Sequence, residues 1–491
     1  MAIPDLKGGQ YKVLQKEQLE KIHFATLQVL EEVGIRIEHP KALEIFKENG
    51  CWVDFAHKLV KVPEHVLKKA LNSAPSRFTL YGKTPQYNIN VNVNTRNVYT
   101  IGGSSALWVL DLEGKRKSAT LEDLMQLTRL QDNLENLHIM HGIVNPQDIP
   151  QAGFCRRLFA TVMQNTHRNY YSQAEDAQDV RDQIEMASLI LGDKKKVSQK
   201  PIFTEVVCMV SPLTHPREML DVLIESAKWR IPLYIEADSQ PGATSPVTLA
   251  GTLVEQNATI LTGIVLAQLI NPGTPCIYSI ASGIMDMKTG NYSGAAPETS
   301  LLHAATAQVA YFYNLPFQGG TGIDAKIPDA QAGYERALQV LSCALAGVNF
   351  IHLSIGMMEQ MLLASYEQCV IDNEILGGAF RILQGMEVNP ETMAVDVIKE
   401  VGPGGNFLAH EHTLKNFRKV EWFPKLTNRD KWPNWEAKGK MSMRQRAKDE
   451  AKKILKEYHP HILPSKVALE LDKMAKDAQE RVLSRKGRSV D

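Results

Sequence analysis

The stretch "IFTEVVCMVSPLTHPREMLDVLIESAKWRIPLYIEA", residues 202–237, contains the pattern that decides the fold. A run rich in β-branched and aromatic residues at 202–210 is followed by a helical pattern at 217–229 and by a second apolar run at 232–237. Parallel strands need a crossover between them, and a helix is its usual form. The stretch therefore predicts one strand–helix–strand unit of an α/β protein.

The same unit repeats on both sides of this stretch. Strands are predicted at 98–103, 137–144, 169–174, 202–210, 232–237, 276–282, 316–320 and 350–356. Helices are predicted at 121–134, 151–165, 177–191, 217–229, 248–270, 297–313, 329–346 and 359–385. Eight strand–helix units favour a closed (β/α)8 barrel of the TIM type, with an open doubly wound sheet as the alternative.

The barrel is expected to occupy residues 98–385. Three helical patterns before it predict an N-terminal helical cap at 1–97. After it, residues 386–491 hold a glycine-rich loop, "VGPGGNF" at 401–407, and two charged helices near 442–457 and 465–484. We expect this C-terminal extension to pack on the barrel.

Charge and cysteine content exclude several classes of protein. Lys and Arg number 55, as do Asp and Glu, which argues against nucleic-acid or anionic-membrane binding. The six cysteines form no CxxC pair, so we expect neither a disulfide framework nor a protein-bound metal. The first residues show no secretory signal and no apolar run reaches membrane-spanning length, which predicts a cytoplasmic protein. We also expect a homo-oligomer.

A barrel of this kind carries its site at the carboxyl ends of the strands. Candidates there share small or polar character: Gly103, Ser104, Glu236, Thr244, Ser245, Gly319, Gly320 and Asp324. The glycines of "GGTGIDAKIPDAQAGYE" (319–335) are interpreted as room for a ligand to approach the backbone. Thr244 and Ser245 are expected to cap the helix at 248–270, whose amino terminus could hold a carboxylate.

Strand alternation places other candidates. Phe350, His352 and Ser354 share one face of a strand, which predicts that they point into the barrel. His138 and His141 lie three apart, hence on opposite faces, and make a poor metal pair. Glu205 lies early in its strand and is expected to pair with a basic residue at the barrel bottom.

Lys326 and Asp324 leave two alternatives open. The two residues form either a loop-bracing ion pair or one wall of the site. Lys326 also permits an alternative function, a barrel lyase that uses a Schiff base.

Four stretches together resemble the trimethylamine methyltransferase (MttB) superfamily: 242–275, "MDMKTGNYSGAAPE" (285–298), "GGTGIDAKIPDAQAGYERA" (319–337) and "GPGGNFLAHEHTL" (402–414). The resemblance implies a TIM-type barrel that moves a methyl group from a methylamine to the Co(I) corrinoid, a cobalamin, of a separate partner protein. Founding members contain pyrrolysine. This chain contains only the twenty common residues and so resembles the branch without pyrrolysine, which acts on quaternary amines.

Quaternary amines suit a site without a general acid. Attack on a methyl carbon of glycine betaine expels dimethylglycine with a neutral tertiary amine, so no proton has to be delivered. Glycine betaine is the predicted substrate, with proline betaine, carnitine and γ-butyrobetaine as alternatives.

A betaine needs aromatic faces for its ammonium and donors for its carboxylate. The aromatic candidates are Tyr99, Trp108, Tyr278, Phe317 and Phe350. His352 is the expected carboxylate donor, with Gln318 and the helix start at 244–248 as alternatives. Gly404, Gly405 and His412 belong to the family-like "GPGGN" motif, which is expected either to close over the pocket or to form a structural turn.

Overall fold

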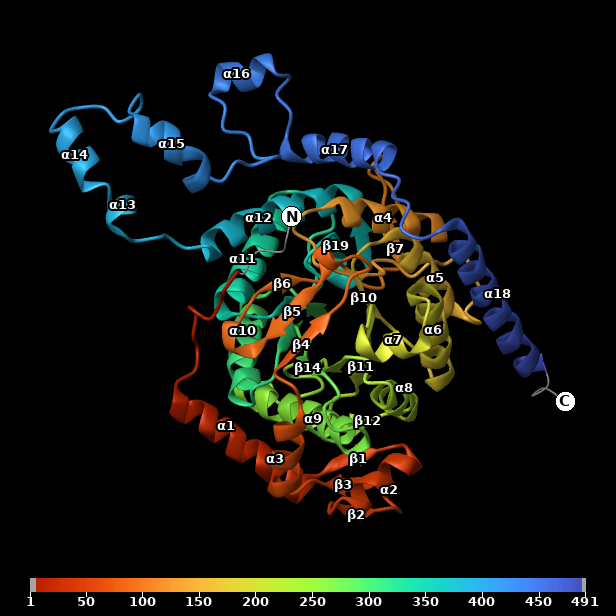
Figure 1. Ribbon diagram of the computed structural model, residues 1–491. Helices are drawn as coiled ribbons and strands as arrows, with labels where there is room; N and C mark the ends of the chain where they lie inside the picture. The colour runs from red at the N-terminus through yellow and green to blue at the C-terminus, as the bar shows by residue number, and fades with distance from the viewer. Residues whose placement is uncertain (1–5, 488–491) are drawn as a thin grey trace.

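The computed structural model describes residues 6–487 and contains a closed barrel of eight strands (Figure 1). In chain order the strands are β6 (Tyr99–Thr100), β9 (Ile139–His141), β10 (Asn169–Ser172), β11 (Phe203–Met209), β13 (Leu233–Ala237), β14 (Cys276–Ser279), β17 (Phe317–Gly319) and β18 (Phe350–Ile351). All seven ladders between neighbours are parallel, and a parallel bridge between Ile101 and Ile139 closes the ring. The predicted TIM-type barrel is confirmed.

A ring of helices surrounds the strands. Its members are α4 (Leu121–Asn133), α5 (Phe154–Asn165), α6 (Ala177–Leu191), α7 (Lys194–Gln199), α8 (Arg217–Lys228), α9 (Leu249–Ile270), α10 (Pro297–Phe312), α11 (Ala330–Ala346) and α12 (Tyr366–Leu383). Local signals fix several ends. Thr120 forms a capping box, Asp176 and Asp329 cap the amino termini of α6 and α11, and Gly192 and Gly347 end helices in the left-handed conformation.

Every predicted barrel strand is present but most are shorter than predicted. The run 350–356 pairs only over Phe350–Ile351, because Leu353 has a φ of 53° and the chain leaves the ladder. The predicted helix at 359–385 begins only at Tyr366. Two further strands, β19 (Met357–Met358) and β20 (Leu363–Ser365), precede it, and β20 pairs with β7 (Trp108–Leu110), which pairs with β8 (Arg116–Ser118).

The segment before the barrel is not purely helical, in contrast to the expectation. It holds α1 (Lys16–Gln28), α2 (Pro40–Glu48) and α3 (Glu64–Ser73), and also the strands β1 (Ile35–Ile37), β2 (Trp52–Asp54) and β3 (Leu59–Lys61). These form a four-stranded sheet in the order β12-β1-β3-β2, in which β1 pairs with β12 (Thr214–His215). A separate hairpin, β4 (Arg77–Leu80) and β5 (Ile89–Asn92), follows. These strands are set by pairing with distant segments, which local periodicity does not show.

One part of the C-terminal extension packs on the helices around the barrel, and the other part does not. The helices α17 (Met443–Glu457) and α18 (Ser465–Gly487) pack against α12 and against α5 and α6. Between them and α12, the short helices α13 (Pro390–Met393), α14 (Val395–Val401), α15 (Glu411–Val420) and α16 (Trp432–Ala437) reach away from the barrel.

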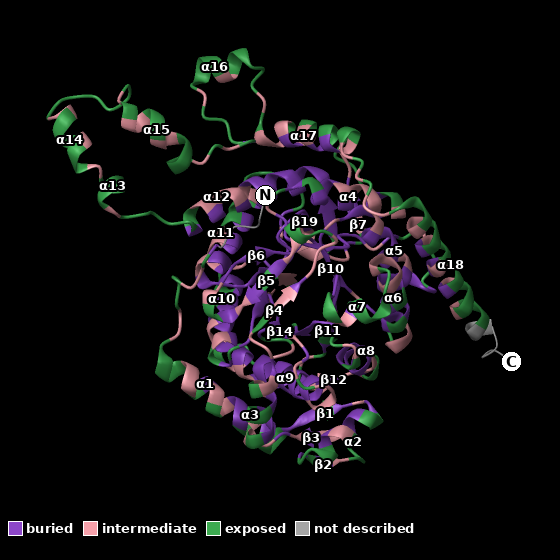
Figure 2. Ribbon diagram, in the orientation of Figure 1, coloured by how far each residue is buried: buried purple, intermediate pink, exposed green. Residues whose placement is uncertain are grey.

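Helix α9 is long and apolar enough, by length and composition, to cross a membrane. This differs from the expectation that no apolar run has that length. However, 83% of its apolar window is buried inside the protein, and α1 and α3 pack along it. Figure 2 shows it among the buried elements. Its composition is explained by burial on several sides.

Candidate active site

The floor of the barrel is apolar and closed by the hairpin β4–β5. The interior cluster consists of Tyr99, Ile101, Ile139, Tyr171, Tyr234, Ile277 and Phe350 with Leu80, Ile89 and Val91 of the hairpin. The hairpin is fixed at the amino-terminal ends of the strands, where the Lys83 N–H donates to the His167 carbonyl (2.8 Å). The Tyr99 hydroxyl donates to the Asn90 carbonyl (3.1 Å) and its ring stacks on Phe350. Tyr99 and Phe350, expected to bind substrate, therefore form this floor.

Above the floor, a carboxylate lies among polar side chains from four neighbouring strands. The Ser279 hydroxyl donates to Glu236 Oε2 (2.7 Å) and also contacts Gln318 Oε1. The Cys208 thiol donates to Glu236 Oε1 (3.4 Å). The Tyr171 hydroxyl lies 3.5 Å from Glu236 Oε2 and 3.4 Å from Gln318 Oε1. The structure thus brings two predicted site residues, Glu236 and Gln318, into one cluster.

This carboxylate has no basic partner. Within residues 6–487, neither Lys nor Arg forms an ion pair with Glu236, whose side chain is buried. Burial, followed by the nearby Asp238 carboxylate, raises the pKa of Glu236 to about 8. A buried carboxylate of this kind is stable either with a proton or beside a cation. The cluster is therefore suited to a positively charged ligand.

A chain of hydrogen bonds runs from His352 to the barrel mouth. His352 Nε2 lies 3.2 Å from His141 Nδ1, and His141 Nε2 lies 3.2 Å from the Ser104 hydroxyl. Ser104 donates to Ser105 (3.0 Å), which donates to Gln173 Oε1 (3.3 Å). Burial lowers the pKa of His352 to about 3 and that of His141 well below its usual value, so both rings are neutral.

The direction of these hydrogen bonds determines which nitrogen of each histidine ring carries the hydrogen. Ser104 uses its hydrogen toward Ser105, so its oxygen accepts from His141 Nε2–H. His141 Nδ1 then accepts from His352 Nε2–H, which leaves His352 Nδ1 as a bare acceptor. His352 was expected to donate to a carboxylate. In this arrangement its one N–H is already committed to His141.

A cavity of about 650 Å3 opens at the mouth of the barrel beside these groups. Cys208 and Gln173 line it, which connects it to the carboxylate cluster and to the histidine chain. The other lining residues come from the loops and strands around them: Leu107, Asn145, Pro146, Gln147, Ile149, Gln151, Phe154, Cys155, Ala174, Glu175, Val206 and Met219. This cavity is the candidate active site.

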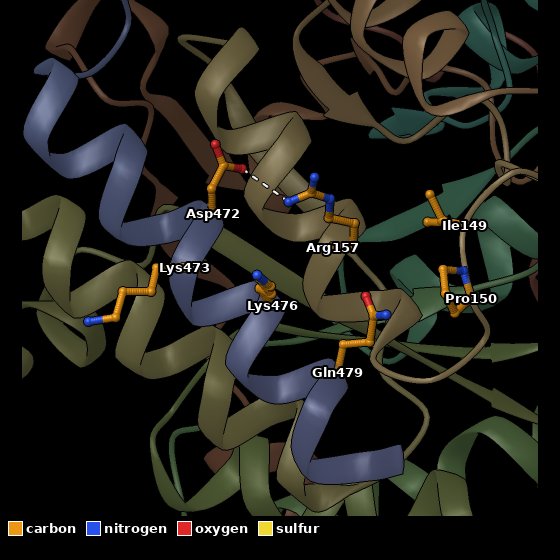
Figure 3. A pocket seen from close by; sticks show the side chains of 7 residues that line it. All are labelled: Ile149, Pro150, Arg157, Asp472, Lys473, Lys476 and Gln479. Atoms are coloured by element: carbon orange, nitrogen blue, oxygen red, sulfur yellow. Dashed lines mark hydrogen bonds and ion pairs between the residues drawn. The ribbon is translucent and has the colours of Figure 1, made fainter. Parts of the chain in front are cut away.

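A second cavity, of about 410 Å3, lies outside the barrel between α5 and α18 (Figure 3). Its polar lining includes Arg157, which forms an ion pair with Asp472 (3.2 Å), and Lys476. These side chains are at the surface and neutralise each other in part. The cavity does not reach the barrel interior groups and is not the candidate site.

The glycines after β17 are required by the protein's own packing. Gly320 has a φ of 117°, and a Cβ there would lie 2.6 Å from the His352 carbonyl oxygen. A Cβ on Gly319 would lie 2.8 Å from the Phe317 ring, and one on Gly103 would lie 2.5 Å from Met357. The protein's own packing therefore accounts for Gly319 and Gly320, and their interpretation as room for a ligand stays a prediction.

Asp324 braces the loops above the barrel. It accepts from the Ser293 hydroxyl and from the Gly294 N–H (3.1 Å), at the end of the hairpin β15 (Ile284–Asp286) and β16 (Asn291–Ser293). Lys326 is exposed to solvent and is not its partner. Asp324 thus holds the hairpin in place, and Lys326 lies outside the enclosed interior that Schiff-base chemistry needs.

The loop after β13 does not cap α9 as expected. Helix α9 begins at Leu249 with Thr248 before it, and no side-chain cap is present. The Thr244 hydroxyl instead accepts from the Gln240 N–H (2.9 Å), and the Ser245 and Thr252 hydroxyls are 2.8 Å apart. Thr244 and Ser245 stabilise a turn.

Tyr278 lies on the outer side of the barrel wall, and Trp108 lies in β7, outside the eight barrel strands. The Tyr278 hydroxyl donates to Asn257 of α9 (3.2 Å), and Tyr278 packs edge-on against Phe317. Trp108 lies under the Arg116 guanidinium, 4.0 Å from the ring centre. In contrast to the expectation, Tyr278 does not face the interior. Strand parity requires this, because its neighbour Ser279 does.

His138 lies where the sequence predicts it, whereas Glu205 lacks the partner that the sequence predicts. His138 faces outward against Phe380, opposite to His141, as the three-residue spacing predicts. Glu205 is buried on the outer side, and within the described chain neither of its oxygens has a partner. The expected basic partner is absent there. Burial raises the pKa of Glu205 well above its usual value, which describes a protonated carboxyl.

The "GPGGN" motif does not cover the pocket. Gly404, Gly405 and His412 lie on the segment that carries α14 and α15, which extends away from the barrel. Gly404 has a φ of 83°, so it serves a turn between the two helices.

Sequence reasoning missed Tyr171, Cys208 and Ser105. Tyr171 contacts both the carboxylate cluster and the two histidine rings, at ring-centre distances of 4.5 Å to His141 and 4.9 Å to His352. Cys208 resembled an ordinary core thiol. Strand alternation was the available signal, since Tyr171 and Cys208 both lie on inward positions.

Comparison with known proteins supports one family. Residues 3–481 match the family model described as trimethylamine methyltransferase (MTTB). The chain is 35% identical to a glycine betaine methyltransferase of Desulfitobacterium hafniense (strain Y51), over 94% of this chain and 96% of that protein. It is 36% identical to a trimethylamine methyltransferase MttB of D. hafniense (strain DSM 10664 / DCB-2), over 94% and 93%.

Solved structures support the fold. The monomethylamine methyltransferase MtmB of Methanosarcina barkeri matches with a TM-score of 0.51 at 14% identity, over 92% of this chain and 96% of that one. This likeness concerns the barrel and its additions. The match to the family model and the two relatives establish that the chain belongs to the trimethylamine methyltransferase (MTTB) family and is an enzyme of the methyltransferase class.

Proposed function

We propose that the enzyme moves a methyl group from a quaternary amine, glycine betaine in the first place, to the corrinoid of a separate partner protein. The observation that carries this proposal is the buried Glu236 carboxylate, which has no basic partner within residues 6–487 and accepts from Cys208, a residue that lines the mouth cavity. A permanently charged ammonium compensates such a carboxylate at every pH. One relative is named for glycine betaine, which is a quaternary amine, and another for trimethylamine, which is a tertiary amine.

The groups around Glu236 supply the rest of an ammonium site. The Tyr171 ring lies beside the His141 and His352 rings, and this aromatic wall adjoins the carboxylate. Ring faces attract a cation and cannot hydrate it. Glu236 would hold the ammonium, and the ring wall would exclude water from the methyl group that leaves.

The carboxylate end of a betaine needs donors on the opposite side. Gln173 stands at the mouth end of the histidine chain and lines the cavity, and its Oε1 accepts from the Ser105 hydroxyl. We assign the carboxylate to the amide N–H groups of the Gln173 side chain, which Ser105 holds in place. His352 would serve instead only if it released His141. Proline betaine, carnitine and γ-butyrobetaine remain the alternative substrates. Proline betaine keeps the spacing between ammonium and carboxylate and adds a ring, whereas carnitine and γ-butyrobetaine lengthen that spacing.

The corrinoid fits the open end of the barrel. Asn145 and Gln147 line the cavity at its outer part, and the cavity is open to solvent. When the partner is bound, the corrinoid supplies a Co(I) centre that accepts the methyl group. The residues of this chain orient the amine so that one methyl group points to the mouth. The neutral tertiary amine then leaves without receiving a proton.

This chemistry uses no pyrrolysine and no metal held by this chain. Within residues 6–487, no group of three His, Cys, Asp or Glu side chains is placed to hold a metal ion. We also propose a cytoplasmic location, which suits a reaction with a strongly reduced cobalt centre.

The direct experiment supplies free cob(I)alamin and each candidate amine, including trimethylamine, and measures the demethylated product by mass spectrometry. Dimethylglycine from glycine betaine is the expected product. Glu236→Gln should lose most of the activity, whereas the exposed Glu185→Gln should keep it. Turnover of trimethylamine alone, or of none of the amines, would overturn the proposal.

A further inference from the structure

A second carboxylate, that of Asp238, lies between the Glu236 cluster and the mouth of the barrel. Asp238 directly follows β13 and comes two residues after Glu236, so the two side chains point to the same side of the strand. Two residues along a strand span about 6–7 Å. Glu236 is buried, whereas Asp238 is exposed to solvent. Asp238 is therefore the carboxylate that a ligand meets first on its way to Glu236.

The surroundings of Asp238 indicate that it faces the barrel interior. After burial, the charge of Asp238 is the next largest cause of the raised pKa of Glu236. After burial and Glu236, it also contributes to the raised pKa of Cys208, which is exposed to solvent and lines the mouth cavity. Asp238 Oδ1 accepts from the Ala281 N–H (2.7 Å), just after β14. This hydrogen bond fixes the carboxylate at the entrance.

No positive charge neutralises this entrance. Within residues 6–487, neither Lys nor Arg forms an ion pair with Asp238. Among the residues that line the mouth cavity, all of them in the described part of the chain, Glu175 has the one charged side chain. The path to Glu236 therefore has a negative potential, which attracts a cation and repels an anion.

The group assigned to the substrate carboxylate lies on another side of the mouth. Gln173 follows β10, and β11 separates β10 from β13 in the barrel. A betaine whose ammonium lies at Glu236 can direct its carboxylate toward Gln173 or toward Asp238. The charge of Asp238 disfavours the second orientation.

From these observations we propose that Asp238 is a specificity-determining residue, which attracts the ammonium end of the substrate and repels its carboxylate end. The same charge favours a quaternary amine that lacks a carboxylate over a zwitterion with the same ammonium group. The inference rests on the proposed function, because it takes the ammonium to lie at Glu236.

Choline and glycine betaine are a matched pair of ligands for the test. Both carry a trimethylammonium group, and a CH2OH group in choline takes the place of the betaine carboxylate. Both need the ionised form of Glu236, so the ratio of their dissociation constants does not depend on the protonation of Glu236. Calorimetric titration of the full chain at pH 9, without corrinoid, measures both constants.

Asp238→Asn removes the charge and keeps an oxygen that accepts from the Ala281 N–H. This variant should bind choline about tenfold more weakly, because only an attraction is lost. It should change the dissociation constant for glycine betaine by less than about threefold, because an attraction and a repulsion are lost together. The ratio of the choline constant to the glycine betaine constant should therefore rise.

Two further variants separate charge from shape. Asp238→Glu keeps the charge and should keep the wild-type ratio, as should Asp477→Asn on the exposed face of α18. An unchanged ratio in Asp238→Asn, an equal rise in Asp238→Glu, or a wild type that binds glycine betaine but not choline would overturn the role of Asp238 and leave the proposed function standing. A wild type that binds neither amine would overturn both.

Discussion

Under the proposed function, the protonation of Glu236 should make substrate binding dependent on pH. If an ammonium replaces the proton of Glu236, only the ionised enzyme binds it, and the apparent affinity falls with the ionised fraction. With the pKa of Glu236 raised to about 8, this fraction is about one eleventh at pH 7 and about ten elevenths at pH 9. The dissociation constant for glycine betaine should therefore decrease about tenfold from pH 7 to pH 9.

The other titratable groups near Glu236 do not titrate in this window. Burial and the neighbouring carboxylates raise the pKa of Cys208 well above its usual range, and burial does the same for Tyr171. Burial lowers the pKa of His352 to about 3 and that of His141 well below its usual value, so neither ring titrates between pH 7 and pH 9. Asp238, with a pKa raised to about 6, is ionised above pH 7.

Isothermal titration calorimetry without any corrinoid measures this binding, because no turnover occurs. The ligand does not complicate the result, since its ammonium has no proton and its carboxylate stays ionised. Glu236→Gln should bind weakly with a flat profile from pH 7 to pH 9, and Glu185→Gln should keep the wild-type profile. A wild-type dissociation constant that is constant from pH 7 to pH 9 would refute the reasoning.

Three further substitutions test the surroundings of the site. Gly320→Ala should lower the free energy of unfolding by about 1–3 kcal/mol, because of its φ of 117° and the contact with the His352 carbonyl; an unchanged melting temperature would contradict this. Arg336→Met should lower the free energy of unfolding, measured in urea, by about 3–5 kcal/mol, because the substitution leaves the fully buried Asp372 without its 3.2 Å ion pair. A loss below about 1 kcal/mol would show that the pair is dispensable. Lys326→Ala should keep the demethylation rate within about twofold of the wild-type rate, since surface changes away from a site have small effects. Loss of the demethylation activity in this variant would favour the Schiff-base alternative.

The barrel could be predicted from the sequence because its signal is local and repeated. Each strand is a short apolar run and each crossover a helix with its own caps, as Asp329 shows for α11. The pairing of β1 with β12 could not be predicted, since Arg36 pairs with Thr214, which lies far from it in the sequence. Pairing between distant segments depends on the tertiary fold.

The site was predictable where a polar residue interrupts an apolar strand, as with Glu236 and Gln318. It was not predictable where the residue type is common in cores, as with Tyr171 and Cys208. Tyr278 and Ser279 are adjacent in a strand and therefore face opposite sides of the barrel wall, but the sequence does not indicate which one faces inward. The direction of the histidine chain depends on Ser104 and Ser105, whose contacts exist only in the folded protein.

The hairpin β4–β5 has a kinetic consequence. Because it closes the floor of the barrel, amine and partner protein share the entrance at the mouth. Under the proposed function, the amine has to enter before the partner covers that entrance, and the demethylated product has to wait until the partner departs. We expect a compulsory order of addition, in which excess partner slows the enzyme by trapping it empty or with product still inside.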